Sequence, residues 1–155
     1  MGFNTINVKT MLIEVKVKVA RVIDGKTRKR TETYIVDDCQ LFVEAEHQVT
    51  AALVEEQNGG VVEEFEIQSL RISPIREVCT EYSGQFSFIA TLKDVFLADD
   101  GTEKALKYKV LLWADSLSEA MARTNVFARQ GYDMSVEGLK EVNYEYITSG
   151  GESND

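Results

Sequence analysis

Apolar and polar residues alternate along residues 13–19, a period of two that predicts a strand with one face against a core and one face in water. Asp24-Gly25 follows, a dipeptide that favours a tight hairpin turn because glycine accepts a positive φ. The β-branched and aromatic residues of 28–36 predict the return strand. Apolar residues then recur at helical spacing along 42–53, and alternation resumes along 61–72. The first half of the chain therefore predicts strand, turn, strand, helix and strand.

The second half repeats this order of patterns. Alternation along 86–92 leads to the turn signal Asp99-Asp100-Gly101, and 106–113 predicts a return strand. Apolar residues at helical spacing along 117–128 predict a second helix, and 142–146 marks a last strand. The two halves therefore predict the same set of elements.

Capping residues set the predicted ends of the two helices. The acidic pair at 37–38 is expected to cap the first helix and Asp115 or Ser116 the second, because these side chains accept hydrogen bonds from the first turn. The glycine pair at 59–60 and Gly131 are expected to end them. The inner stripe of the second helix is predicted to consist of Leu117, Ala120, Met121, Thr124, Phe127 and Ala128.

The stretches 13–72 and 86–147 align with an offset of about 75 residues, so that Glu44 lies over Glu119 and Ile67 over Val142. A three-stranded sheet with one helix is marginal alone, because it buries little apolar surface. We therefore predict an α+β fold of two tandem ββαβ repeats, with a mainly antiparallel, six-stranded sheet and two helices packed on it. The predicted organisation is an N-terminal extension (1–12), a first repeat (13–79), a second repeat packed on the first as one globular unit (80–148) and a disordered acidic tail (149–155).

The net charge of −9 is unevenly distributed along the 155 residues. Residues 1–34 carry eight basic and three acidic side chains, a formal charge of +5. The remaining residues carry nine basic and 23 acidic side chains, a formal charge of −14. Such an asymmetry points to an interaction surface in the basic part.

Basic residues gather on the first predicted hairpin and its outgoing strand. A basic hairpin can enter a nucleic-acid groove or follow a phosphate backbone, and its charges give salt-dependent affinity. The alternative is an edge hairpin whose bases only protect the sheet against aggregation, in a chain whose acidic remainder repels nucleic acid. Tyr34, Tyr82 and Tyr108 could stack on bases, but their placement favours core or cross-strand packing. The candidate nucleic-acid-binding residues are Lys16, Lys18, Lys26, Arg28, Lys29 and Arg30.

The sequence offers no signature of catalysis, and we predict no catalytic residue, no metal site and no cofactor. The single histidine, His47, falls in the first predicted helix without cysteine or histidine partners at ligand spacing. Cys39 and Cys79 are interpreted as reduced, buried thiols. Residues 99–103 depart from the spacing of a calcium loop and are better explained as a hairpin turn. We expect a protein that is not an enzyme.

No apolar run in the sequence is long enough to span a membrane. Residues 1–11 lack the apolar core of a secretory signal. The expected location is therefore the cytoplasm, with no membrane partner.

Three stretches carry a resemblance to a known family: residues 16–19, residues 31–37 with the sequence Thr-Glu-Thr-Tyr-Ile-Val-Asp, and residues 42–46 with the sequence Phe-Val-Glu-Ala-Glu. They resemble an uncharacterised domain family, of unknown function, from gut bacteria and their phages or mobile elements. Residues 110–121 are similar to the second half of that family, so the resemblance covers residues 13 to about 147. It implies a phage or mobile-element origin and a bacterial host cell, and it brings no activity with it.

These observations support three hypotheses of different classes. The first is a nucleic-acid-binding accessory protein that uses the basic hairpin. The alternative is an acidic protein-binding module that antagonises or regulates a host or phage protein, because a dense negative surface can compete for a basic site. The third is a small-molecule site, for a nucleotide, at the seam between the repeats. Self-association is a further expectation, since the basic hairpin of one molecule could meet the acidic surface of another.

Overall fold

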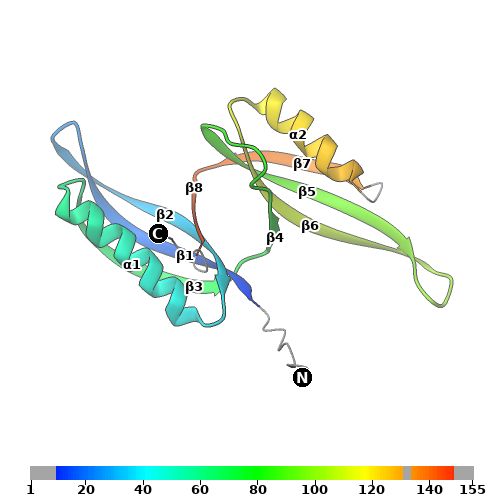
Figure 1. The fold of residues 1–155 in the computed structure, drawn as a ribbon, viewed down its shortest axis with the longest axis horizontal. Coiled ribbons are helices and arrows are strands. Elements are labelled where there is room, and N and C mark those ends of the chain that lie inside the picture. The colour runs from blue at the N-terminus through cyan, green and yellow to red at the C-terminus, as the bar shows by residue number, and fades with distance from the viewer. Residues whose placement is uncertain (1–9, 131–133, 149–155) are drawn as a thin grey trace, which may run out of the picture. The chain divides into compact units, whose positions relative to one another are not determined.

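The alternating apolar residues of the first half form the centre of a four-stranded sheet, here called sheet A (Figure 1). The computed structural model describes residues 10–130 and 134–148. Strands β1 (Met11–Ile23), β2 (Lys26–Cys39) and β3 (Val62–Ile72) are antiparallel, and β8 (Tyr144–Thr148) lies parallel to β2 at the edge. The strand order is β3-β1-β2-β8.

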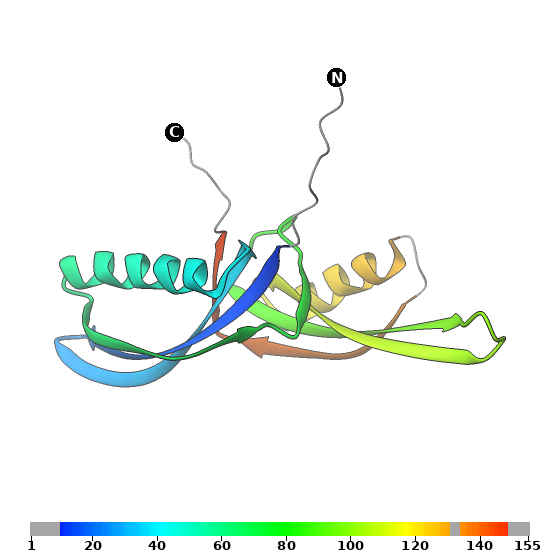
Figure 2. The same ribbon diagram turned by 90° about the horizontal axis from the view of Figure 1, so that it is seen from below.

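Helix α1 (Phe42–Asn58) lies along one face of sheet A, as Figure 2 also shows. Its buried residues Ala45, Val49 and Leu53 are spaced by four, so they form one stripe. Opposite them lie the fully buried valines and isoleucine of β1, which all point to the same face because their spacing is two. The β1 residues of this core are Ile13, Val15, Val17 and Val19.

The second half of the chain builds sheet B, with the strand order β4-β6-β5-β7. Strands β5 (Phe86–Leu97), β6 (Glu103–Ala114) and β7 (Ser135–Val142) are antiparallel, and β4 (Ile75–Val78) lies parallel to β6. Helix α2 (Leu117–Arg129) packs on the face that carries Phe88, Ala90 and Leu92.

The predicted α+β fold with mainly antiparallel strands and two helices is confirmed, but the single six-stranded sheet is wrong. The described residues form two sheets of four strands each, and they divide into two units at Ser73–Pro74 and at Asn143–Tyr144. The reason is that each half ends in a short additional strand. β4 joins sheet B and β8 joins sheet A, each parallel to a return strand. The order of elements in each half is thus ββαββ, and the tandem ββαβ repeat stays a prediction.

The ends of the helices correct one prediction and confirm another. The acidic pair at 37–38 does not cap α1, because β2 continues to Cys39. The helix begins after Leu41, and the carboxylate of Glu44 accepts a hydrogen bond from the Leu41 N–H at 2.7 Å. Of the two candidates for the cap of α2, Ser116 is the one that caps it, since its hydroxyl accepts from the Glu119 N–H at 3.1 Å.

Three further predictions fail or lie outside the described residues. Leu117 and Met121 are exposed by 59% and 39%, so the buried stripe of α2 is narrower than predicted. Val142 does not correspond to Ile67, because Ile67 pairs with Val17 whereas Val142 pairs with Ser87, at the far end of β5. Gly131, the extension before residue 10 and the tail after residue 148 are not described.

Candidate nucleic-acid interface

The six predicted basic residues lie on two sides of the β1–β2 hairpin. Residues directly opposite each other in an antiparallel pair share a face. Lys29 is paired with Ala20 on the face away from α1, here called the outer face of sheet A, whereas Arg30 is paired with the buried Val19 on the helix side. The outer face carries Lys16, Lys18 and Lys29, and the helix side carries Lys26, Arg28 and Arg30.

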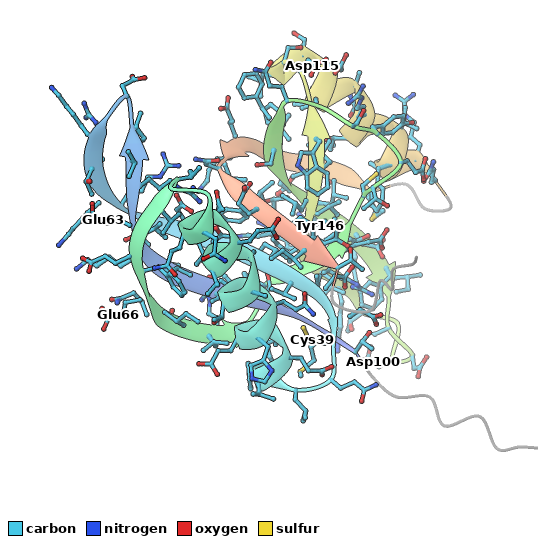
Figure 3. All side chains as sticks on the ribbon, turned by 60° about the vertical axis from the view of Figure 1, so that its left-hand side comes forward. Cys39, Glu63, Glu66, Asp100, Asp115 and Tyr146 are labelled. Atoms are coloured by element: carbon cyan, nitrogen blue, oxygen red, sulfur yellow. The ribbon has the colours of Figure 1, made fainter. Side chains whose placement is uncertain are left out.

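The outer face of sheet A has mixed charge. A groove of about 470 Å³ lies there, and its lining includes Lys18, Lys29, Glu64 and Glu66. Lys18 is paired in register with Glu66, which Figure 3 labels, and the Lys29 Nζ lies 4.0 Å from the Glu64 Oε1. Both acids belong to β3, so this strand offsets part of the positive charge of the neighbouring strands.

Arg21 contributes to the basic count of the first 34 residues, but it is buried among acids. Its side chain is only 11% exposed. The guanidinium donates hydrogen bonds to Glu32 through Nε and Nη2, and to Glu56 through Nη1 at 2.8 Å and Nη2 at 3.1 Å. These bonds, with those to Glu32 the stronger, raise the pKa of Arg21 above its ordinary value. The residue therefore joins β1, β2 and α1 and is not available to a ligand.

Arg30 is also tied to Glu32, with an Nε–Oε2 distance of 2.7 Å. Burial raises the pKa of Glu32, but the hydrogen bonds from Arg21 and Arg30 outweigh it, and the net pKa lies below its ordinary value. Glu32 is therefore ionised at neutral pH and balances part of the charge of both arginines.

The remaining four candidate residues lie outside the ion pairs of the described residues. In residues 10–130 and 134–148, no acidic side chain forms an ion pair with Lys16, Lys18, Lys26 or Arg28. Lys26 and Arg28 are exposed on the tip of the hairpin, residues 22–30, here called the basic arm. Its four bases and one acid give a formal charge of +3. Bases without protein partners are the ones that phosphates can attract at least cost.

The outer face of sheet B carries a second group of bases, which the sequence analysis did not single out. Lys93 on β5 lies directly opposite Lys107 on β6, and Lys109 follows two residues along the same strand. Lys140 on β7 is paired with Ile89, which places it on the same face. Two like charges directly opposite each other destabilise a sheet, so this arrangement carries a cost.

Acidic residues are sparse around these lysines. The Glu137 carboxylate lies 3.5 Å from the Lys107 Nζ, and it forms the one ion pair of this group within the described residues. The sequence held a signal for the group, because Lys107 and Lys109 alternate with apolar and aromatic residues along the predicted return strand. Register, which sequence alone does not give, was needed to bring Lys93 and Lys140 to the same face.

The three candidate stacking tyrosines each pack against other residues of their own unit. Tyr34 is 3% exposed in the core of sheet A. Tyr82 lies under the Arg123 guanidinium at 4.8 Å, and Tyr108 lies under that of Arg76 at 4.7 Å. The core position of Tyr34 and the cross-strand contact of Tyr108 agree with the interpretation made from the sequence, whereas Tyr82 lies outside the strands and packs on an arginine of α2.

The structure also places the single histidine and the two cysteines. His47 is exposed on α1, and Cys39 is buried. Burial raises the pKa of the Cys79 thiol, which leaves it in its less nucleophilic, protonated form. No group of three or more histidine, cysteine or acidic side chains is placed to hold a metal ion in the part of the chain that the structure describes.

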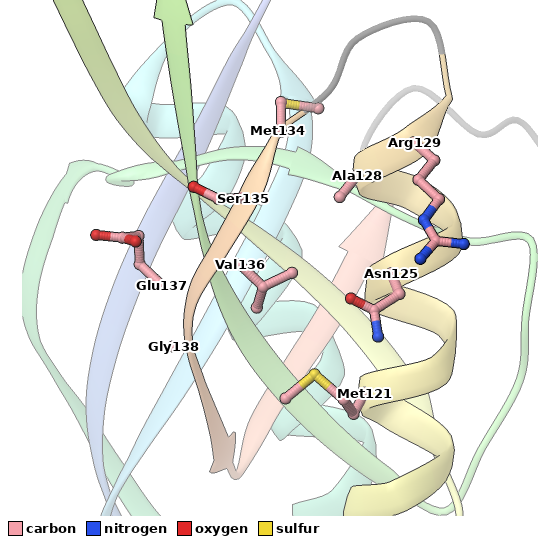
Figure 4. Close-up of a pocket in the computed structure, with 9 residues that line it drawn as sticks. All are labelled: Met121, Asn125, Ala128, Arg129, Met134, Ser135, Val136, Glu137 and Gly138. Carbon is pink, nitrogen blue, oxygen red and sulfur yellow. The ribbon is translucent and has the colours of Figure 1, made fainter.

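A groove of about 510 Å³ lies between α2 and β7 (Figure 4). Met121, Asn125 and Arg129 of α2 face it from one side and Val136 from the other. Its charged residues are Arg129 and Glu137, and Glu137 also pairs with Lys107. The groove is open, and its described lining offers no converging set of polar groups.

Comparisons with known proteins give a family but no activity. No curated protein and no solved structure matches the chain. Neither helix in the described ranges is long and apolar enough to cross a membrane. The model of one family, named Domain of unknown function (DUF4494), matches residues 11–149. Since this match covers most of the 155 residues, the chain belongs to the DUF4494 family.

Proposed function

We propose that this chain is a nucleic-acid-binding accessory protein without enzymatic activity, which docks through the basic arm and the adjoining outer face of sheet A. The observation that carries the proposal is that Lys16, Lys18, Lys26 and Arg28 have no ion-pair partner among the described residues. A phosphate that meets such a base displaces a counterion and no protein carboxylate, so the contact yields net affinity.

The shape of the basic arm fits a groove better than a flat surface. Lys29 points to one side of the two-stranded ribbon, and Lys26 and Arg28 point to the other. A ribbon that enters a groove meets phosphates on both of its sides, and two-stranded ribbons are known to fit the major groove of DNA. The division of the bases between two faces therefore favours insertion.

The lysines on the outer face of sheet B support the same function as a second phosphate-binding surface. Lys93, Lys107, Lys109 and Lys140 form a positive group with one ion pair, Lys107–Glu137, among the described residues. The total charge of −9 nevertheless repels a polyanion at long range. Binding should therefore be short-ranged and strongly salt-dependent.

A salt titration tests the proposal. Fluorescence anisotropy of labelled duplex and single-stranded DNA and RNA is measured across a series of salt concentrations. The wild-type chain is expected to bind at low salt and to lose affinity steeply as salt rises. The variant K26A/R28A/K29A/R30A should lower the slope of log K against log salt by roughly 2 to 4, because each phosphate contact contributes about 0.9.

A charge-conserving variant supplies the matched control. K26R/R28K/K29R/R30K keeps the charge of the arm and should keep most of the affinity and slope. Absence of binding at low salt, or equal affinities for the wild-type chain and the alanine variant, would contradict the proposal.

We place this activity in a phage or mobile element inside a bacterial cell, on the strength of the resemblance of residues 13–147. Flanking genes without phage or mobile-element character would contradict that setting. The alternative, an acidic module that binds a host protein, draws support from the formal charge of −14 outside residues 1–34. Capture of one basic protein from host lysate, together with no affinity for nucleic acid at low salt, would favour it.

A further inference from the structure

The β5–β6 hairpin extends beyond the rest of sheet B, as Figure 1 shows. Among the described residues, β7 pairs with β5 only as far as Lys93, and β4 pairs with β6 only from Lys109. Residues 94–106, here called the acidic arm, therefore form a two-stranded ribbon. Its strand edges carry backbone N–H and C=O groups that no described strand covers.

The acidic arm exposes an unusual amount of apolar surface for a ribbon in water. Leu97 is 74% exposed, and Val95, Phe96 and Leu106 are exposed by 44% to 46%. The register places Val95 and Leu97 on one side and Phe96 and Leu106 on the other, so neither side is purely polar. Exposed apolar side chains on both sides of the ribbon are available for burial in a contact.

The charge of this arm is opposite to that of the basic arm. Residues 94–106 hold four acids and one base, a formal charge of −3, whereas residues 22–30 have +3. The basic arm also has an open strand edge, because β8 pairs with β2 only from Thr33 onward within the described residues. The two ribbons therefore have complementary charges, and each has a strand edge that no described strand covers.

We propose that the acidic arm binds the basic arm of a second copy of this chain. The contact is heterologous, because each copy offers two different surfaces, and such contacts produce rings when they close and longer chains when they do not. The charges steer the arms together, and the apolar side chains of the acidic arm gain burial on contact. This inference does not rest on nucleic-acid binding, although both partners would compete for the basic arm.

Two charge-reversal variants test the contact. K26E/R28E/K29E changes the basic arm from +3 to −3, and D94K/D99K/E103K changes the acidic arm from −3 to +3. Asp100 is left intact, since its carboxylate accepts two hydrogen bonds from Thr102 that hold the turn. Circular dichroism and thermal melts verify that both variants fold.

Sedimentation velocity at low ionic strength, where screening is weakest, gives the readout. The wild-type chain should sediment with an apparent mass of at least twice its 17.4 kDa, rising with concentration. Each variant alone should be a monomer, because its two arms then carry the same sign. An equimolar mixture should assemble again, since each reversed arm meets the opposite charge on the other variant.

Other outcomes would overturn the inference. A wild-type chain that is a monomer at every concentration, or a mixture of the two variants that stays monomeric, excludes the contact. Nucleic-acid binding is measured on the same samples. D94K/D99K/E103K should lose self-association and keep that binding, so failure of the arm contact is distinguishable from failure of the proposed function.

Discussion

The basic arm and the acidic arm share one backbone architecture, a two-stranded ribbon, but carry opposite charge. Each is the outer end of an antiparallel hairpin, and each extends past the strands that flank its base. The basic arm closes through the two-residue turn Asp24-Gly25, in which both residues have positive φ, 53° and 77°. The acidic arm closes through a longer loop, with hydrogen bonds between the backbones of Ala98 and Thr102 and of Gly101 and Ala98.

The parts of the two units near the helices differ much less than the arms. Sheet A has a bulge between Lys16 and Val17, and sheet B has one at the matching place, between Thr91 and Leu92. Ala45 and Ala120 are both fully buried, and each follows a glutamate, Glu44 or Glu119, whose carboxylate accepts a backbone hydrogen bond at the start of the helix. The comparison teaches that this architecture demands apolar residues under the helix and leaves the arms free to carry different charges.

The largest expected effect comes from a substitution that unfolds the second unit, because it removes the acidic arm from the comparison. A Cβ at Gly84 would overlap the backbone N, Cα and C atoms of Ala114, at the base of the β5–β6 hairpin. Backbone cannot yield as a flexible side chain does, so Gly84→Ala should destabilise the chain by at least about 3 kcal/mol. Urea denaturation followed by circular dichroism measures the change. The acidic arm should then lose its ordered base, whereas the basic arm lies in the other unit.

Gly138→Ala is the matched control for Gly84→Ala. Gly138 also belongs to the second unit, but none of the described residues places an atom within 4 Å of a Cβ built there. Alanine should therefore change the free energy of unfolding by less than about 1 kcal/mol. Equal effects of the two substitutions would show that the close approach of Gly84 to Ala114 does not matter.

Much of the fold could be predicted because period and turn chemistry act locally. The alternation along β1 and β5 and the Asp-Gly turns gave both hairpins close to their observed places. Which sheet each of the short strands β4 and β8 joins could not be predicted from the sequence. The last predicted strand, 142–146, in fact spans two strands on either side of Asn143, and they belong to different sheets. Parallel pairing of distant segments is a tertiary property that local pattern does not encode.

The candidate site was predicted by composition but not by geometry. Counting charges placed Arg21 with the other bases, although Glu32 and Glu56 neutralise it across 11 and 35 residues of sequence. Counting also missed the lysines of sheet B, because they are spread from Lys93 to Lys140 and gather only through strand register. The fold decides which bases form ion pairs and on which face of a sheet they lie. A sum of charges along the chain therefore shows where the bases are, but not which of them lack an ion-pair partner.

The second prediction concerns the base of the basic arm. Glu32→Gln removes the carboxylate shared by Arg21 and Arg30 and leaves Arg21 buried beside Glu56 alone. The free energy of unfolding should fall by about 2 to 4 kcal/mol at neutral pH, since breaking a buried ion pair costs more than breaking an exposed one. Because the folded pKa of Glu32 lies below its ordinary value of 4.5, its stabilisation is complete above that pH. It is lost as pH falls through the lowered pKa.

Denaturation at a series of pH values measures this effect. The difference between the wild-type chain and Glu32→Gln should be largest at neutral pH and shrink progressively below about pH 4.5. Glu64→Gln is the control, because Glu64 is 68% exposed and lies 4.0 Å from Lys29. Glu64→Gln should lower the free energy of unfolding by less than about 1 kcal/mol. A difference for Glu32→Gln that stayed constant with pH would argue against an ionised Glu32 in the network.

The smallest effect comes from the lysines on the outer face of sheet B. Lys93→Glu replaces a like-charge pair with Lys107 by an opposite-charge pair and should stabilise the chain by about 0.2 to 1 kcal/mol. Affinity for nucleic acid should fall at the same time if this face binds phosphate. Lys104→Glu makes the same charge change opposite Phe96, on the other side of the ribbon, and should gain no stability from a cross-strand lysine. If Lys93→Glu, but not Lys104→Glu, gives greater stability together with weaker nucleic-acid binding, the lysines of this face bind phosphate. Unchanged affinity would leave the basic arm and the outer face of sheet A as the proposed phosphate-binding surface.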